Sequence, residues 1–184
     1  MKSSGMLGLV LLVLAIGARA QSPAVGEQVK IDVSRDRFTD QTTISTAPMK
    51  VHGTTYDNLK ILFLVGYRGT DPTKAAILMG VSQTTKDLPV QAIGDVHVLA
   101  DDRRVTIGRF SKINAQNLLA SVWEHQFSST VEYDKLLVIA KSTKVEMRIG
   151  MIEVELLPAH IDAVRRLLKY IDGTLTFPPL STSK

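Results

Sequence analysis

Cysteine is absent from the 184-residue chain. The sequence therefore excludes disulfide bonds and a lipid-modified thiol as means of holding or anchoring the protein. A chain of this length can bury roughly 68–70% of its unfolded surface in one core. We therefore expect a single domain that is held together by packing alone.

Long hydrophobic runs are also missing. The most continuous apolar run near the start, residues 6–16, has eleven residues, whereas a membrane-spanning helix needs about 20. The run follows Lys2 and precedes Ala18-Arg19-Ala20, which is the layout of a secretory signal peptide with an A-x-A cleavage site. We predict a signal peptide over residues 1–20, cleavage between Ala20 and Gln21, a periplasmic or secreted location, and no stable membrane anchor afterwards.

The chain has little excess of one charge. Its formal net charge is +4, and loss of Lys2 and Arg19 with the signal peptide would leave +2. A nearly neutral protein lacks the electrostatic character of nucleic-acid-binding and anionic-membrane-binding proteins. We therefore expect neither nucleic acid nor an anionic membrane as a partner.

Several catalytic signatures are absent. The sequence contains no G-x-G-x-x-G or P-loop pattern for phosphates and no G-x-S-x-G nucleophile elbow. The four histidines, His52, His97, His125 and His160, are too far apart in sequence to form a local pair of metal ligands. The sequence thus predicts no metal and no cofactor.

What the sequence does contain is apolar residues at alternate positions, the pattern of half-buried strands. After a flexible lead-in at 21–27, strands are predicted near residues 29–34, 42–46, 61–65, 75–82, 95–110 and 120–133. The run 61–65 is apolar on both faces and predicts a central strand, whereas Pro48 predicts edge pairing for 42–46. Residues 95–110 predict a hairpin with Asp102 in a left-handed turn, and residues 117–119 could begin a short helix.

The C-terminal pattern changes from strand to helix. The alternation over 145–149 shifts by one position at Gly150 and resumes over 152–156, which predicts a tight turn or bulge. A short helix is predicted at 134–142, and an amphipathic helix should start at Pro158 and end near Gly173. Arg165, Arg166 and Lys169 should favour the end of that helix through its dipole.

The predicted fold class is therefore mainly β, an antiparallel sandwich or curved sheet of about seven to nine strands, covered by a C-terminal amphipathic helix. The single domain should span residues 28–173, and residues 174–184 should form an extended or disordered tail.

Two sets of residues are candidates for function. Glu153 and Glu155 share a strand face about 7 Å apart, a spacing compatible with an inverting glycosidase but also with a solvated face. His125 is the third candidate in this catalytic set. Trp123, His125 and Phe127 share a strand face and could stack on a glycan or a peptide, or simply belong to the core.

The motif order "RDRFTDQTTIST" (residues 35–46), "LADDRR" (99–104), "VTIGRF" (105–110) and "KVEMRIGMIEVEL" (144–156) resembles a loosely defined set of small exported bacterial proteins of unknown function. These proteins share an RF-x-D-x-TT start, an L-A-D-G-x-R hairpin and a C-terminal strand–strand–helix. In this chain Asp102 replaces the glycine of that hairpin. The resemblance implies export and a β-rich fold, and it implies no activity.

These observations favour a non-enzymatic module of the bacterial envelope that binds a protein or a glycan. The alternative is a hydrolase acting on envelope polymers, with Glu153, Glu155 and His125 as its candidate groups. A purely structural envelope protein is not distinguished from the first interpretation by sequence.

Overall fold

The computed structural model describes residues 28–36, 38–53, 58–69, 72, 75–85, 93–119 and 122–175. The predicted signal peptide, the lead-in and residues 176–184 of the predicted tail lie outside the described residues. Within these ranges, neither helix combines the length and apolar character needed to span a bilayer.

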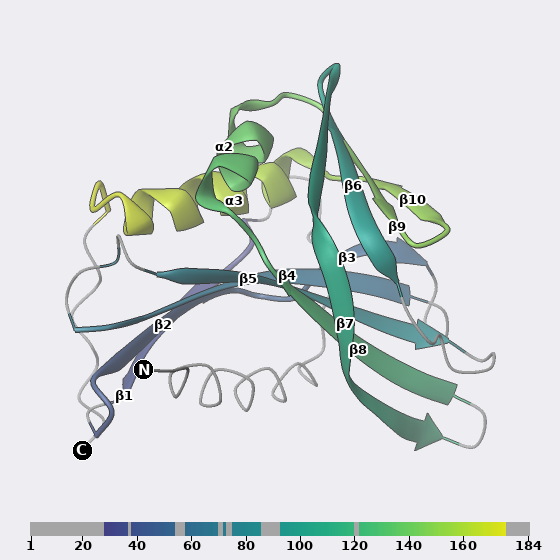
Figure 1. Ribbon diagram of the computed structural model, residues 1–184, viewed down its shortest axis with the longest axis horizontal. Helices are drawn as coiled ribbons and strands as arrows, with labels where there is room; N and C mark the ends of the chain where they lie inside the picture. Colours follow the sequence, from purple (N-terminus) through teal and green to yellow (C-terminus); the bar gives the residue numbers. More distant parts are fainter. Residues whose placement is uncertain are drawn as a thin grey trace.

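Ten antiparallel strands and two helices make up the described part of the chain (Figure 1). The strands are β1 (Ile31–Asp36), β2 (Gln41–Thr46), β3 (Met49–Gly53), β4 (Asn58–Arg68), β5 (Ala76–Thr85), β6 (Gly94–Ala100), β7 (Arg103–Leu119), β8 (Val122–Thr130), β9 (Val145–Ile149) and β10 (Ile152–Glu155). The helices are α2 (Tyr133–Lys141) and α3 (Pro158–Ile171). The strand order is β1-β2-β4-β5-β8-β7-β6-β9-β10, and β3 also pairs with β4. The predicted mainly β fold with a C-terminal helix is confirmed, with one strand more than the upper limit of our prediction.

The curvature of the sheet comes from β7, which is 17 residues long. Its first part pairs with β6 and its second part pairs with β8. The register shifts once along the β6 pairing and twice along the β8 pairing, and such bulges bend and twist a strand. As a result β6, β9 and β10 stand at a steep angle to β2, β4, β5 and β8, and the helices lie within that angle (Figure 1).

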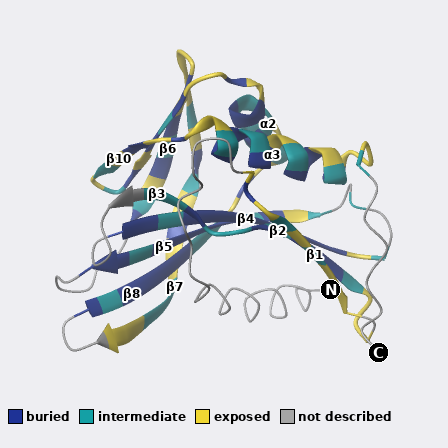
Figure 2. Cartoon of the chain, turned by 180° about the vertical axis from the view of Figure 1, so that it is seen from behind, coloured by how far each residue is buried: buried dark blue, intermediate teal, exposed yellow. Residues whose placement is uncertain are grey.

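The main core fills the space between the sheet and the helices. The apolar residues of α3 that gave the predicted helical period, Ile161, Val164, Leu167, Leu168 and Ile171, are all buried. Strand β4 supplies Leu59, Ile61, Phe63 and Val65 to the same core. Viewed from behind, β4, β5 and β8 are buried along most of their length (Figure 2). The predicted central position of residues 61–65 is confirmed.

The turn between the last two strands and the two ends of the C-terminal helix lie where the sequence predicted them. Strands β9 and β10 form a hairpin with Gly150 at φ +63°, where the apolar positions change parity. Pro158 begins α3, and Gly173 follows its end at φ +71°. In both glycines the absence of a Cβ permits the left-handed backbone that the turn or helix end requires.

Three predictions about local structure were wrong, and one open alternative was not realised. Residues 42–46 do not pair at an edge, because β2 lies between β1 and β4 and the chain resumes as β3 after Pro48. Residues 117–119 continue β7 instead of starting a helix. The left-handed turn residue is Asp101, at φ +50°, and not Asp102.

The third wrong prediction concerns the arginines of α3. Arg165 donates from Nε to the carbonyl of Ala140 and from Nη2 to that of Ser142 at 2.9 Å. Arg166 pairs with Asp162 within the helix and also reaches the carbonyl of Val29. Among the three basic residues, Lys169 alone lies in the last turn of α3. Arg165 thus stabilises the end of α2 and not the end of its own helix.

Candidate functional site

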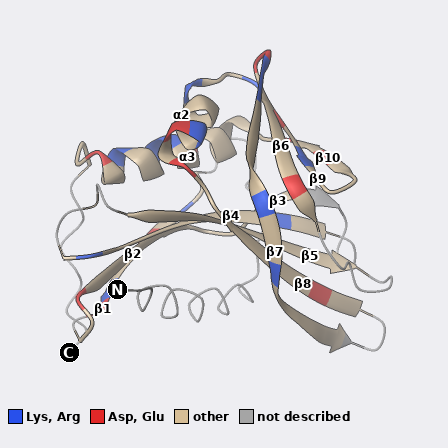
Figure 3. Ribbon diagram, viewed as in Figure 1, with Lys and Arg blue, Asp and Glu red and all other residues tan. Residues whose placement is uncertain are grey.

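The exposed face of β6, β9 and β10, together with the start of β7, forms an open groove of about 600 Å³. We call it the β6–β10 groove. Acidic and basic segments lie beside one another on these strands (Figure 3). The side chains that point away from the core into the groove are His97, Leu99, Arg104, Glu146, Arg148, Glu153 and Glu155.

Strand register brings these side chains together from distant parts of the sequence. Leu99 of β6 is opposite Glu146 of β9, which in turn is opposite Glu155 of β10. In the next row, His97 is opposite Arg148, which is opposite Glu153. Because side chains at alternate positions share a face of a sheet, both predicted glutamates project into the groove and Val154 between them is buried.

Ion pairs organise the charges in the groove. Arg148 Nε donates to Glu153 Oε1 at 3.0 Å, and Nη2 lies 2.8 Å from the same oxygen. Lys144 Nζ lies 2.6 Å from Glu146 Oε1. The hydrogen bond and charge of Glu146, with the charge of Glu155, raise the pKa of Lys144. Across the hairpin Glu155 is opposite Glu146, and the positive charge of Lys144 offsets the repulsion between these two carboxylates.

The groove does not assemble the catalytic set expected from sequence. Glu153 is held by Arg148, and His125 lies buried on β8 instead of lining the groove. The histidine beside the glutamates is His97, whose Nδ1 lies 3.1 Å from Thr106 Oγ1. Within the described ranges, no three His, Asp or Glu side chains are grouped so that they could hold a metal ion.

Sequence reasoning missed His97, Leu99, Arg104, Glu146 and Arg148 as members of the site. The alternation of β6 and β9 already placed most of them on the polar side of predicted strands. The alternation did not reveal that β6 and β9 are neighbours. About 45 residues separate the two strands, and no local sequence pattern encodes their pairing.

Trp123, His125 and Phe127 form a row on the core-facing side of β8. The rings of Trp123 and His125 are stacked with centroids 6.3 Å apart, and those of His125 and Phe127 are 6.5 Å apart. His125 and Phe127 are fully buried, and Trp123 is half-buried. Without a rearrangement a sugar could reach only Trp123, so stacking on this row stays a prediction.

His125 is a buried histidine without hydrogen bonds. Neither ring nitrogen has a hydrogen-bond partner in the structure. Burial lowers the pKa of His125, and the positive charge of Lys112 lowers it further. The neutral ring is therefore favoured at pH 7, which suits a packing role between two aromatic rings.

No protein-family model matches the chain, and comparison with curated proteins and with solved structures gave no match either.

Proposed function

We propose that the protein is a non-enzymatic binding module of the bacterial envelope and that it contacts a partner protein through the β6–β10 groove. The observation that carries this proposal is the open groove itself, in which carboxylates and guanidinium groups alternate around Leu99, a leucine that is 41% exposed. Interspersed charges of both signs beside an exposed apolar side chain favour a protein surface of complementary charge. The envelope location follows from the predicted signal peptide and from the resemblance described above.

The edge of β10 supports a protein partner over a glycan. β10 is the last strand of the sheet order among the described strands. Leu156 N donates to Val145 O of β9. Val154 and Ile152, two and four residues earlier, are opposite Met147 and Ile149, so their main-chain N–H and C=O groups also point toward β9. In an antiparallel ladder the residues between such pairs direct their main-chain groups outward, so Glu153 and Glu155 offer N–H and C=O groups along the groove. An extended segment of a partner could add to this edge as a further strand.

Two exposed apolar side chains flank the same edge. Met151 is 99% exposed in the hairpin turn, and Leu157 is 46% exposed before α3. Large apolar side chains on both sides of a polar strand edge are suited to anchoring a bound segment at its two ends.

The hydrolase alternative has weaker support. The shared face of Glu153 and Glu155 suits paired carboxylate chemistry. However, Glu153 is engaged by Arg148, and no residue that we expected to assist catalysis lines the groove. A binding surface accounts for the same residues without requiring free carboxylates.

The proposed binding surface can be tested with a photo-crosslinking amino acid at position 99 in the native cell. We expect illumination to yield one discrete adduct with a protein, because Leu99 is exposed and lines the groove. The Arg148→Glu substitution should reduce that adduct at least about 10-fold, since it places a third like charge beside Glu146 and Glu153.

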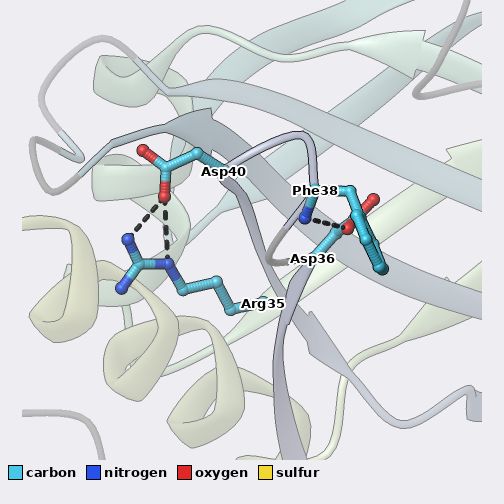
Figure 4. Close-up of polar contacts among 4 residues, drawn as sticks. All are labelled: Arg35, Asp36, Phe38 and Asp40. Atoms are coloured by element: carbon cyan, nitrogen blue, oxygen red, sulfur yellow. Dashed lines mark hydrogen bonds and ion pairs between the residues drawn. The ribbon is translucent and has the colours of Figure 1, made fainter.

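The matched control is the same probe at position 38. Phe38 is 101% exposed at the β1–β2 hairpin, where its N–H donates to Asp36 at 2.8 Å, beside the Arg35–Asp40 ion pair (Figure 4). This surface is far from the groove in sheet order. If positions 38 and 99 give the same adducts, or if position 99 gives none, the groove is not the binding surface.

A further inference from the structure

The outer edge of β10 runs along the β6–β10 groove and carries two accessible carboxylates. Glu153 and Glu155 are exposed, whereas Val154 between them is buried. Among the described residues, no backbone hydrogen bond joins β10 to a strand other than β9, although β3 lies near it. A strand edge with unpaired N–H and C=O groups is a template for a further strand. The positions of the two glutamates along this edge therefore limit which segments can pair with it.

The register of an added strand follows from the β9–β10 ladder. The main-chain groups of Val154 point toward β9, so those of Glu155 point outward. Every strand pairing in the described sheet is antiparallel. In an antiparallel strand added here, the residue opposite Glu155 would exchange two main-chain hydrogen bonds with it, and the two side chains would share the groove face. The next residue would be opposite Val154 and would point to the core side.

Charge distinguishes Glu155 from Glu153. Arg148 contacts Glu153 through both Nε and Nη2, so that carboxylate already has a cation. Within the described part of the chain, Glu155 makes no ion pair and no hydrogen bond through its side chain. The charge of Lys144 acts on Glu155, but its Nζ lies 2.6 Å from Glu146 Oε1. One ammonium group thus serves two opposed carboxylates, and one negative charge remains at the end of β10.

We propose that β10 pairs with an antiparallel strand of a partner protein that carries Lys or Arg opposite Glu155 and an apolar residue opposite Val154. This inference rests on the proposed function and names the partner's chemistry at the same surface. Opposite charges directly across two strands are favourable, and like charges are unfavourable. A second copy is a poor occupant, because pairing of two β10 edges places glutamates of the two chains opposite one another.

The test uses two fluorescent synthetic peptides as probes of the purified full chain. Both are about nine residues long, within the usual length of a strand, and alternate threonine with valine. They differ only at the central threonine position, which is lysine in one peptide and glutamate in its twin. We expect the lysine peptide to bind at least about 5-fold more tightly by fluorescence anisotropy, because its ammonium group meets the Glu155 carboxylate. The preference should reverse in Glu155→Lys and vanish in the milder variant Glu155→Gln.

Backbone methylation of the lysine peptide shows whether it binds as a strand. A methyl group on the nitrogen of the central lysine removes the N–H that would donate to the main-chain carbonyl of Glu155. We expect this change to weaken binding at least about 10-fold. The matched control is a methyl group on the nitrogen of the next valine, whose N–H points away from β10. That peptide should keep its affinity within about 2-fold.

The control for the charge change is Glu132→Lys, the same substitution at an exposed residue before α2. This variant should keep the preference for the lysine peptide, and circular dichroism checks that each variant is folded. Equal binding of the two peptides to the unaltered protein, or failure of both to bind, would overturn the inference, as would an unchanged preference in Glu155→Lys. The proposed function is measured separately by the adduct at position 99. That adduct persists if only the strand pairing is wrong, and it is absent if the groove binds no protein.

Discussion

Replacing Phe63 with alanine is expected to lower the free energy of unfolding by about 3–5 kcal/mol. Phe63 lies in the central strand β4 and is fully buried in the main core. The substitution removes a large apolar side chain and leaves a cavity that the surrounding strands can only partly fill. Because domains of this kind are stable by only about 5–15 kcal/mol, the variant should unfold at a much lower urea concentration.

The matched control is Phe38→Ala, the same substitution at a residue that is 101% exposed. Its free energy of unfolding should stay within about 0.5 kcal/mol of the unaltered protein. Urea titration followed by circular dichroism measures both variants. Equal midpoints for the two alanine variants would contradict the assignment of Phe63 to the core.

The second large effect is expected at Arg165. Its guanidinium group donates to the carbonyl of Ala140, in the last turn of α2, and to that of Ser142, which follows the helix. The Arg165→Ala substitution leaves these carbonyls without that donor, and a hydrogen bond involving a charged group contributes about 1.5–3 kcal/mol. We expect a loss of that size in the free energy of unfolding, measured by urea titration.

Lys169→Ala serves as the control for Arg165→Ala. Lys169 is exposed in the last turn of the same helix, where its interaction with the helix dipole contributes less than about 1 kcal/mol. If the two substitutions cost the same, Arg165 acts through the dipole of α3, as the sequence suggested, and not as a link between the two helices.

The parts of the fold that sequence predicted are those encoded by local periodicity. The three- and four-residue spacing of Ile161, Val164 and Leu168 defines the buried side of α3 whichever partner it packs on. The shift at Gly150 likewise predicts a turn, because a one-residue change of parity exchanges the two faces of a strand.

The parts that sequence did not predict depend on pairing between distant strands. Pro48 suggested an edge, but β2 is paired on both sides and the chain continues as β3 beyond the proline. Arg165 was assigned to the dipole of α3 because the sequence does not show that α2 ends beside it.

The same distinction between local pattern and distant pairing applies to the candidate site. Glu153 and Glu155 were identified from alternation within one strand, whereas Leu99 and Arg148 joined them only through the register of β6, β9 and β10. Likewise, the row Trp123, His125 and Phe127 was predicted from spacing, but which side of β8 faces the core is decided by the helices and strands packed against it.

The β6–β10 groove exists only if the strand register places Glu155 of β10 opposite Glu146 of β9 on the exposed face of the sheet. Since the chain has no cysteine of its own, a pair of engineered cysteines can test this register without competing disulfides. Residues directly opposite one another on two antiparallel strands have Cβ atoms about 4.5–5.5 Å apart, close to the separation that a disulfide needs.

The most direct measurement is therefore oxidation of the folded double variant Glu146→Cys/Glu155→Cys, compared with Glu146→Cys/Glu153→Cys. The first pair should form an intramolecular disulfide under mild oxidation. The second pair is diagonal across the hairpin, about 7–8 Å apart, and should remain reduced. Formation of the diagonal disulfide, or failure of the first pair to oxidise in the folded protein, would contradict the register and with it the groove.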